Sequence, residues 1–155
     1  MLKNEKGQAV APKTVIMTKK DFEDQGNTRV YWLGGGGAMI NDHGTVIMID
    51  PLLEGFDIPL LIDMPIDVKD VPHVDAILVS HVDNDHYSRP TCRDLKDICK
   101  AYHTSYYVAS LMKEECGVDG IGHDIGDHIQ INDIDVELTP ADHAWQNQVA
   151  KYNYR

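Results

Sequence analysis

The chain has 155 residues, 43% of them hydrophobic and 25% charged, which is the composition of one globular domain and not of a disordered, fibrous or disulfide-dense protein. Fourteen Lys and Arg against 25 Asp and Glu give a formal net charge of -11, and a surface of that sign repels nucleic-acid phosphates. No apolar run reaches the roughly 18 residues of a membrane-spanning helix, and the first residues lack the apolar core of a secretory signal. We therefore expect a cytoplasmic chain that binds neither nucleic acid nor a membrane.

The N-terminal half predicts a β-meander or hairpin. Residues 1–13 are mostly polar or small and show no periodicity, so we expect a loose lead-in before a single domain over 14–155. Short apolar runs bounded by glycine and turn residues predict strands at 30–33, 38–40 and 45–49.

Glycines 34–37 lie between the first two of these strands. Neither common phosphate-binding motif fits them, because no Lys-Ser/Thr pair and no correctly placed third glycine follow. A tight hairpin turn explains the run better, since glycine adopts the positive φ angles that such turns need. Asp42-His43-Gly44 predicts the next turn.

The C-terminal half alternates between strand and helix patterns. A buried strand is predicted at 74–80. Apolar residues then recur at helical spacing after a start signal at Ser88 and Pro90: Cys92, Leu95, Cys99 and Tyr102. The remaining elements are expected to be a short strand at 106–108, a helix capped by Ser110 and ended by Gly117, and strands at 128–131 and 134–138. This order predicts an α/β or α+β fold in which helices cover a sheet.

Side chains that can bind a cation gather directly after the buried strand. Within six residues the chain carries His81, Asp83, Asp85 and His86. Alternation along an extended chain directs the first two to one side, and the turn that follows can return the other two towards them. An EF-hand calcium loop is excluded, because Tyr87 and Ser88 stand where that loop needs an oxygen ligand and a glycine. Carboxylate with imidazole is the ligand mixture of a metal site, although a solvated loop would have the same composition.

The segment His81-Val82-Asp83-Asn84-Asp85-His86 resembles the H-x-H-x-D-H signature of the metallo-β-lactamase superfamily, with aspartate in place of the second histidine. Segments 33–40 and 46–51 are similar to the superfamily's opening hairpin and its strand that ends in I-D-P, and 138–145 is similar to the strand end that supplies a further histidine. The resemblance covers roughly 28–146, and its nearest branch contains L-ascorbate-6-phosphate lactonase and related metal-dependent hydrolases. It implies the N-terminal portion of a four-layer αββα sandwich whose C-terminal half is missing from the chain.

The resemblance also implies a set of metal ligands. His81 and His143 would bind a first metal ion together with Asp83, and Asp85 with His86 would bind a second. A carboxylate at position 83 makes the first site harder and more negative, which favours manganese or iron over zinc. One or two divalent ions (Mn, Zn or Fe) are therefore the expected cofactors. Asp50 is expected to be either a partner of a ligating histidine or a turn-forming aspartate.

These ligands imply a hydrolase that uses a metal-bound water on a small ester, lactone or phosphorylated metabolite, with Asp85 helping to orient that water. The expected partners are an anionic small molecule and either a second copy of the chain or the missing C-terminal half. The alternative is a non-catalytic half-domain that acts as a binding or self-assembly module with an incomplete metal site, because 146–155 contain no aspartate or histidine.

Three cysteines without C-x-x-C spacing, Cys92, Cys99 and Cys116, predict reduced thiols. Cys92 lies on the apolar stripe of its predicted helix, which disfavours a role as nucleophile. The histidines at positions 43, 73, 103, 123 and 128 have no comparable context and are expected at the surface or hydrogen-bonded in the core.

Overall fold

The computed structural model describes residues 3–11, 13–57, 60, 62–141 and 143. Its main sheet has six strands in chain order, β1 (Thr28–Gly34), β2 (Gly37–Asp42), β3 (Thr45–Ile49), β4 (Ala76–Val79), β5 (Tyr102–Ser105) and β6 (Gly120–His123). The first three strands are antiparallel, and β3 to β6 run parallel to one another. Strands β7 (His128–Ile131) and β8 (Ile134–Glu137) form a separate antiparallel hairpin.

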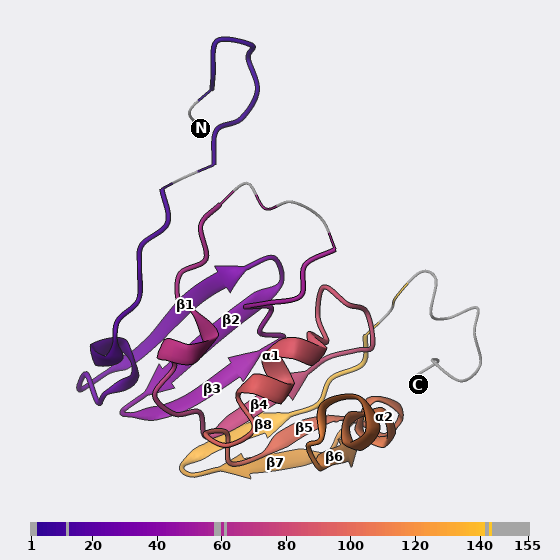
Figure 1. Ribbon diagram of the computed structural model, residues 1–155. Coiled ribbons are helices and arrows are strands. Elements are labelled where there is room, and N and C mark those ends of the chain that lie inside the picture. Colours follow the sequence, from indigo (N-terminus) through magenta and orange to yellow (C-terminus); the bar gives the residue numbers. More distant parts are fainter. Residues whose placement is uncertain (1–2, 12, 58–59, 61, 142, 144–155) are drawn as a thin grey trace.

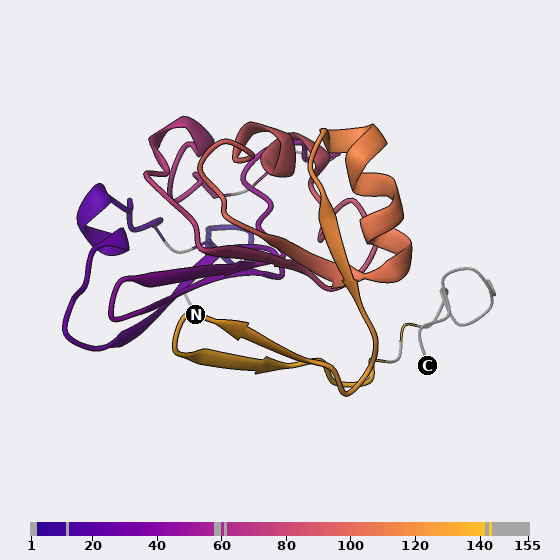
Figure 2. The same ribbon diagram turned by 90° about the horizontal axis from the view of Figure 1, so that it is seen from below.

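The molecule has three layers (Figure 1, Figure 2). Helices α1 (Arg89–Asp94) and α2 (Tyr106–Cys116) cover one face of the main sheet, together with the 3-10 turn η2 (Val68–Asp70). The β7–β8 hairpin lies against the other face, and a second 3-10 turn, η1 (Lys19–Phe22), precedes β1. This arrangement confirms the α/β prediction. None of the helices in the described part of the chain is long and apolar enough to cross a bilayer.

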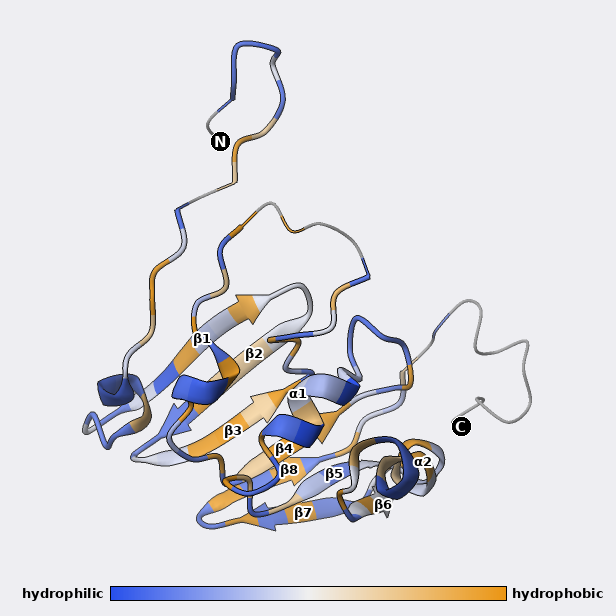
Figure 3. Cartoon of the chain, in the orientation of Figure 1, coloured by the Kyte–Doolittle hydropathy of each residue, from blue (hydrophilic) through white to orange (hydrophobic). Residues whose placement is uncertain are grey.

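Each face of the sheet carries its own apolar cluster. Strands β3 and β4 are apolar on both faces (Figure 3), as parallel strands covered on two sides require. Met48 and Ile77 pack under the helices, whereas Ile47 and Ala76 pack against Ile129 of the hairpin. Burial on both faces therefore explains the unbroken apolar runs of these two strands.

The hairpin covers only part of its face of the sheet. Cross-strand pairing places Val30 of β1 opposite Ile40 and Ile40 opposite Ile47, so all three side chains share the face on which the hairpin lies. Val30 and the neighbouring Trp32 on that face are 71% and 59% exposed. The structure thus leaves an uncovered apolar area over β1, which we call the open face of β1.

The predicted hairpins are confirmed. Gly34 and Gly35 have φ angles of 100° and 55°, which side chains rarely adopt, so the glycine run makes the tight β1–β2 turn. His43 and Gly44 also have positive φ in the β2–β3 turn, and β7 and β8 lie where the pattern predicts them.

Residues 92–108 differ from the prediction. The helix that begins after Ser88 ends at Asp94 and does not continue to Tyr102, which belongs to β5. Residues before Tyr102 already pair with β4 and with the segment that precedes it, because Val74 N–H donates to Ile98 O at 3.1 Å and Ile77 N–H to Ala101 O at 3.0 Å. Bonds between strands that are distant in sequence therefore override the helical spacing.

The predicted strand at 106–108 is wrong, since these residues form the first turn of α2. Ser105, and not Ser110, caps this helix by accepting a hydrogen bond from Val108 N. Gly117 ends the helix as predicted. Strand β6 was not predicted, because its Gly-Ile-Gly-His sequence lacks a β-type run.

Candidate metal centre

The site lies where two parallel strands end at the same edge of the sheet. Strand β3 ends at Ile49 and β4 at Val79, and Ile49 pairs with Leu78. Asp50 and Ser80 follow directly, so their side chains meet although they are 30 positions apart. Asp50 adopts φ 45°, a left-handed conformation that aspartate tolerates, and its N–H still donates to Leu78 O at 2.9 Å.

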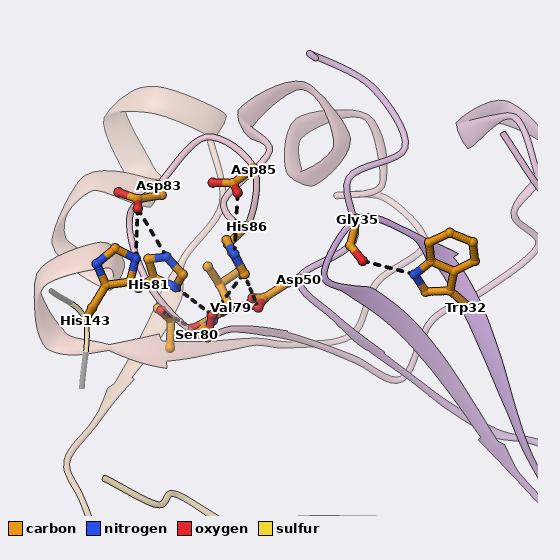
Figure 4. A network of polar contacts seen from close by, with 11 residues as sticks. Trp32, Gly35, Asp50, Val79, Ser80, His81, Asp83, Asp85, His86 and His143 are labelled. Carbon is orange, nitrogen blue, oxygen red and sulfur yellow. Dashed lines mark hydrogen bonds and ion pairs between the residues drawn. The ribbon is translucent and has the colours of Figure 1, made fainter. Parts of the chain in front are cut away.

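His81, Asp83 and His143 form one cluster beyond this edge (Figure 4). Each offers one ligand atom, and these atoms all lie within 4.8 Å of one another. Asp83 Oδ2 is 3.3 Å from His81 Nε2 and 3.4 Å from His143 Nε2. Within the described ranges no other group of three potential ligands is brought together so closely. Folding thus joins a histidine from the end of the described chain to the segment after β4.

The chemistry of this cluster fits a divalent cation. Among the described residues, His81 Nε2 is buried and has no hydrogen-bond partner, because its contact with Asp83 lacks hydrogen-bond geometry. Burial, followed by the nearby His86, lowers the pKa of His81, against the opposing effect of Asp83 and Asp50. A neutral imidazole with a free lone pair, next to a carboxylate, is what a metal ligand requires.

Asp85 and His86 are less closely assembled. His86 Nε2 lies 3.7 Å from Asp85 Oδ2, and the Asp85 side chain is 75% exposed. The His86 ring stacks at a tilt on that of His81, with centroids 4.1 Å apart. His86 therefore adjoins the cluster, while Asp85 extends into solvent above it.

Asp50 holds the His86 ring from below. Its Oδ2 lies 2.7 Å from His86 Nδ1, and because an ionised carboxylate only accepts, the imidazole must donate. Asp50 is 4% exposed and also accepts from Ser80 N and Ser80 Oγ, at 2.7 and 2.6 Å. It is thus both a residue of the strand-end turn and a partner of a histidine in the site.

Two contributors lie outside the predicted set, Ser80 and Gly36. Ser80 Oγ lies 2.9 Å from His81 Nδ1 as well as against Asp50. A Cβ added to Gly36 would lie 2.9 Å from His86 Cε1, so the glycine turn packs directly against this ring. The position of Ser80 between a strand and His81 was the available signal; nothing in the sequence indicated the contact of Gly36.

The cysteines and the histidines at positions 103, 123 and 128 make their contacts outside this cluster. Cys92 is buried, and burial raises the pKa of its thiol, which agrees with a packing role. All three cysteines are free thiols, as predicted. His103 Nδ1 lies 2.9 Å from His123 Nε2, and His128 Nδ1 lies 2.9 Å from Asp135 Oδ2.

Known proteins share this fold. The model of a beta-lactamase superfamily domain matches residues 45–154. CmlA, a diiron beta-hydroxylase from Streptomyces venezuelae, superposes with a TM-score of 0.59 at 15% identity, over 74% of this chain and 24% of that protein. Igni18, a metallo hydrolase from Ignicoccus hospitalis, superposes with a TM-score of 0.58 at 21% identity, over 76% of this chain and 50% of that protein. A protein from Parabacteroides distasonis assigned as a metal-dependent hydrolase superposes with a TM-score of 0.57 at 17% identity, over 82% of this chain and 53% of that protein.

These similarities concern the fold. The chain spans from about a quarter to about half of the length of these proteins, with shares of 24%, 50% and 53%. No curated protein sequence matches the chain.

Proposed function

The chain belongs to the beta-lactamase superfamily, and we propose from this and from its candidate metal centre that it is part of a metal-dependent hydrolase. The observation that carries the proposal is the cluster of His81, Asp83 and His143, in which the buried Nε2 of His81 has no hydrogen-bond partner among the described residues. Two of the structurally similar proteins are described as metal-dependent hydrolases, which supports the general class.

The proposed ligands divide into two sets. His81, Asp83 and His143 would hold one divalent ion, and Asp85 with His86 would hold a second beside it. When bound, such ions lower the pKa of water towards neutrality and stabilise the negative charge that develops on the substrate oxygen. The exposed carboxylate of Asp85 can accept a hydrogen bond from the attacking water and so orient it. Asp50 keeps the Nδ1 side of His86 occupied and leaves Nε2 available.

We propose that the metal is manganese or iron in preference to zinc. Asp83 lies between the two histidines of the cluster and supplies a carboxylate oxygen, which is a harder ligand than a third imidazole. The substrate is proposed to be a small anionic ester, lactone or phosphorylated metabolite, on the strength of the branch that the sequence resembles. A cytoplasmic location is part of the same proposal.

The open face of β1 favours a second candidate function. An area of exposed apolar side chains such as Val30 and Trp32 promotes association. The chain could then be a binding or self-assembly module that pairs with the rest of the sandwich or with a second copy. Metal content distinguishes the candidates, because the enzyme requires bound divalent ions and the module does not.

Elemental analysis of the purified full-length protein and of two variants tests the hydrolase. His81→Ala and His86→Ala should each lose bound metal and turnover while the fold remains, since both residues lie in a loop after β4 and not in the core. His128→Ala is a matched control, because this exposed histidine lies on the β7–β8 hairpin and pairs with Asp135, at 2.9 Å. Unchanged metal content and activity in both site variants would exclude the assignment.

A further inference from the structure

The hydrogen bonds around Ser80 form one continuous chain between the two sets of proposed ligands. Ser80 Oγ lies 2.6 Å from Asp50 Oδ2 and 2.9 Å from His81 Nδ1. Asp50 Oδ2 also lies 2.7 Å from His86 Nδ1. One hydroxyl and one carboxylate thus connect His81 to His86 (Figure 4).

The positions of the protons along these hydrogen bonds follow from Asp50, the one member that cannot donate a hydrogen bond. An ionised carboxylate has no proton, so both the Ser80 hydroxyl and His86 Nδ1–H must donate to Asp50. The hydroxyl has a single proton, and donating it leaves only lone pairs for the contact with His81. His81 Nδ1 must therefore carry a proton, and a neutral His81 then has its lone pair on Nε2.

The competing tautomer has a partner of its own. Asp83 Oδ2 is 3.3 Å from His81 Nε2 and could accept a proton from that nitrogen after a small movement. This arrangement would place a hydrogen atom where a cation needs the lone pair. Without an acceptor at Nδ1, Asp83 would favour the tautomer that cannot bind metal.

We propose that Ser80 is a positioning residue that holds His81 in the tautomer whose Nε2 lone pair faces Asp83 and His143. This inference rests on the proposed role of His81 as a metal ligand. Ser80 is exposed as a residue, whereas its two partners are shielded from solvent: Asp50 is 4% exposed and the His81 side chain 14%. Asp50 contacts His86 directly and His81 through the Ser80 hydroxyl, which makes Asp50 and Ser80 one unit serving both sets of ligands.

Nitrogen NMR of the metal-free full chain tests the tautomer directly. At mildly alkaline pH, long-range ¹H–¹⁵N spectra of the wild type, assigned with a His81→Asn variant, should show a protonated Nδ1 and an unprotonated Nε2. Ser80→Ala should shift His81 towards the Nε2–H form, and Ser80→Thr, which keeps the hydroxyl, should retain the wild-type pattern. An Nε2–H tautomer in the wild type, or an identical tautomer in Ser80→Ala, would overturn the inference.

Metal affinity provides the second measurement. Removing a partner that orients a ligand weakens binding by about 10–100-fold, and we expect Ser80→Ala to bind Mn²⁺ more weakly by that factor. Ser105→Ala is the control, because this serine also ends a strand but caps α2 and contacts none of the proposed ligands. A loss of affinity in Ser105→Ala equal to that in Ser80→Ala would assign the effect to general destabilisation and overturn the role of Ser80.

The two proposals fail differently. A wild-type chain that has the Nδ1–H tautomer, and loses it in Ser80→Ala, but binds no divalent ion would refute the hydrolase and leave the positioning role of Ser80 supported. A chain that binds metal equally well with and without the hydroxyl would refute the role of Ser80 alone.

Discussion

Gly36→Ala should displace His86 and weaken the second metal site. The new Cβ would lie 2.9 Å from His86 Cε1, whereas carbon atoms in contact prefer about 3.5–4.0 Å. The ring must therefore move by several tenths of an ångström or more. Since His86 Nδ1 is 2.7 Å from Asp50 Oδ2, that movement distorts a short charge-assisted hydrogen bond and so weakens it.

The net loss of stability is the cost of the clash minus what alanine gains over glycine in the unfolded state. Overpacking in a tight site costs about 1–3 kcal/mol, and a hydrogen bond to a charged group contributes a comparable amount. Replacing glycine by alanine returns about 0.4–1 kcal/mol through the unfolded state, because Gly36 is not among the residues with positive φ. We expect a loss of about 1–2 kcal/mol, which lowers the melting temperature of a domain of this size by roughly 2–8 °C.

A double-variant cycle separates the contact with His86 from a general effect on the turn. Thermal unfolding is measured for the wild type, Gly36→Ala, His86→Ala and the double variant, all without metal. Once His86 is alanine, the clash is gone and Gly36→Ala should be neutral or slightly stabilising. Gly35→Asn is the control, since nothing lies within 4 Å of a Cβ at this position and asparagine tolerates its φ of 55°. An equal loss of stability in both backgrounds would refute the reasoning.

Three further outcomes are expected. Asp83→His should move the metal preference towards zinc and make binding more sensitive to acid, and identical preference orders for wild type, Asp83→His and Asp83→Ala in metal competition would exclude Asp83 as a ligand. Burial opposes the charge of Asp75, but hydrogen bonds from Lys100 and Val46 outweigh it and lower the pKa of this carboxyl. Its stabilising contribution should be complete above about pH 4 and lost as the pH falls through the lowered pKa. The free energy of unfolding in urea should therefore fall less steeply with acid in Asp75→Asn than in the wild type. Cys92 is 1% exposed and its thiol pKa is raised by burial, so it should resist thiol reagents at neutral pH until the chain unfolds, and labelling as fast as that of an exposed thiol would contradict its placement.

Features governed by neighbouring residues were predictable from the sequence. The β1–β2 and β2–β3 turns follow from glycine and its tolerance of positive φ, and the end of α2 at Gly117 has the same cause. The runs of β3 and β4 are apolar enough to require burial on two faces. The segment from His81 to His86 likewise indicated either a cation site or a polar loop. That choice depends only on which side chains are present, namely imidazoles and carboxylates.

Only the tertiary structure determined how residues 92–108 divide between helix and strand. Tyr102 fits a helical spacing, yet it pairs with Ile77 of β4, and its position depends on a strand that the local pattern does not contain. The same physics governs the site. Asp50 and Ser80 meet because two parallel strands end together, and His143 reaches Asp83 only through the fold. The sequence shows which side chains are present. The hydrogen bonds that orient them at the site form between distant segments, which only folding brings together.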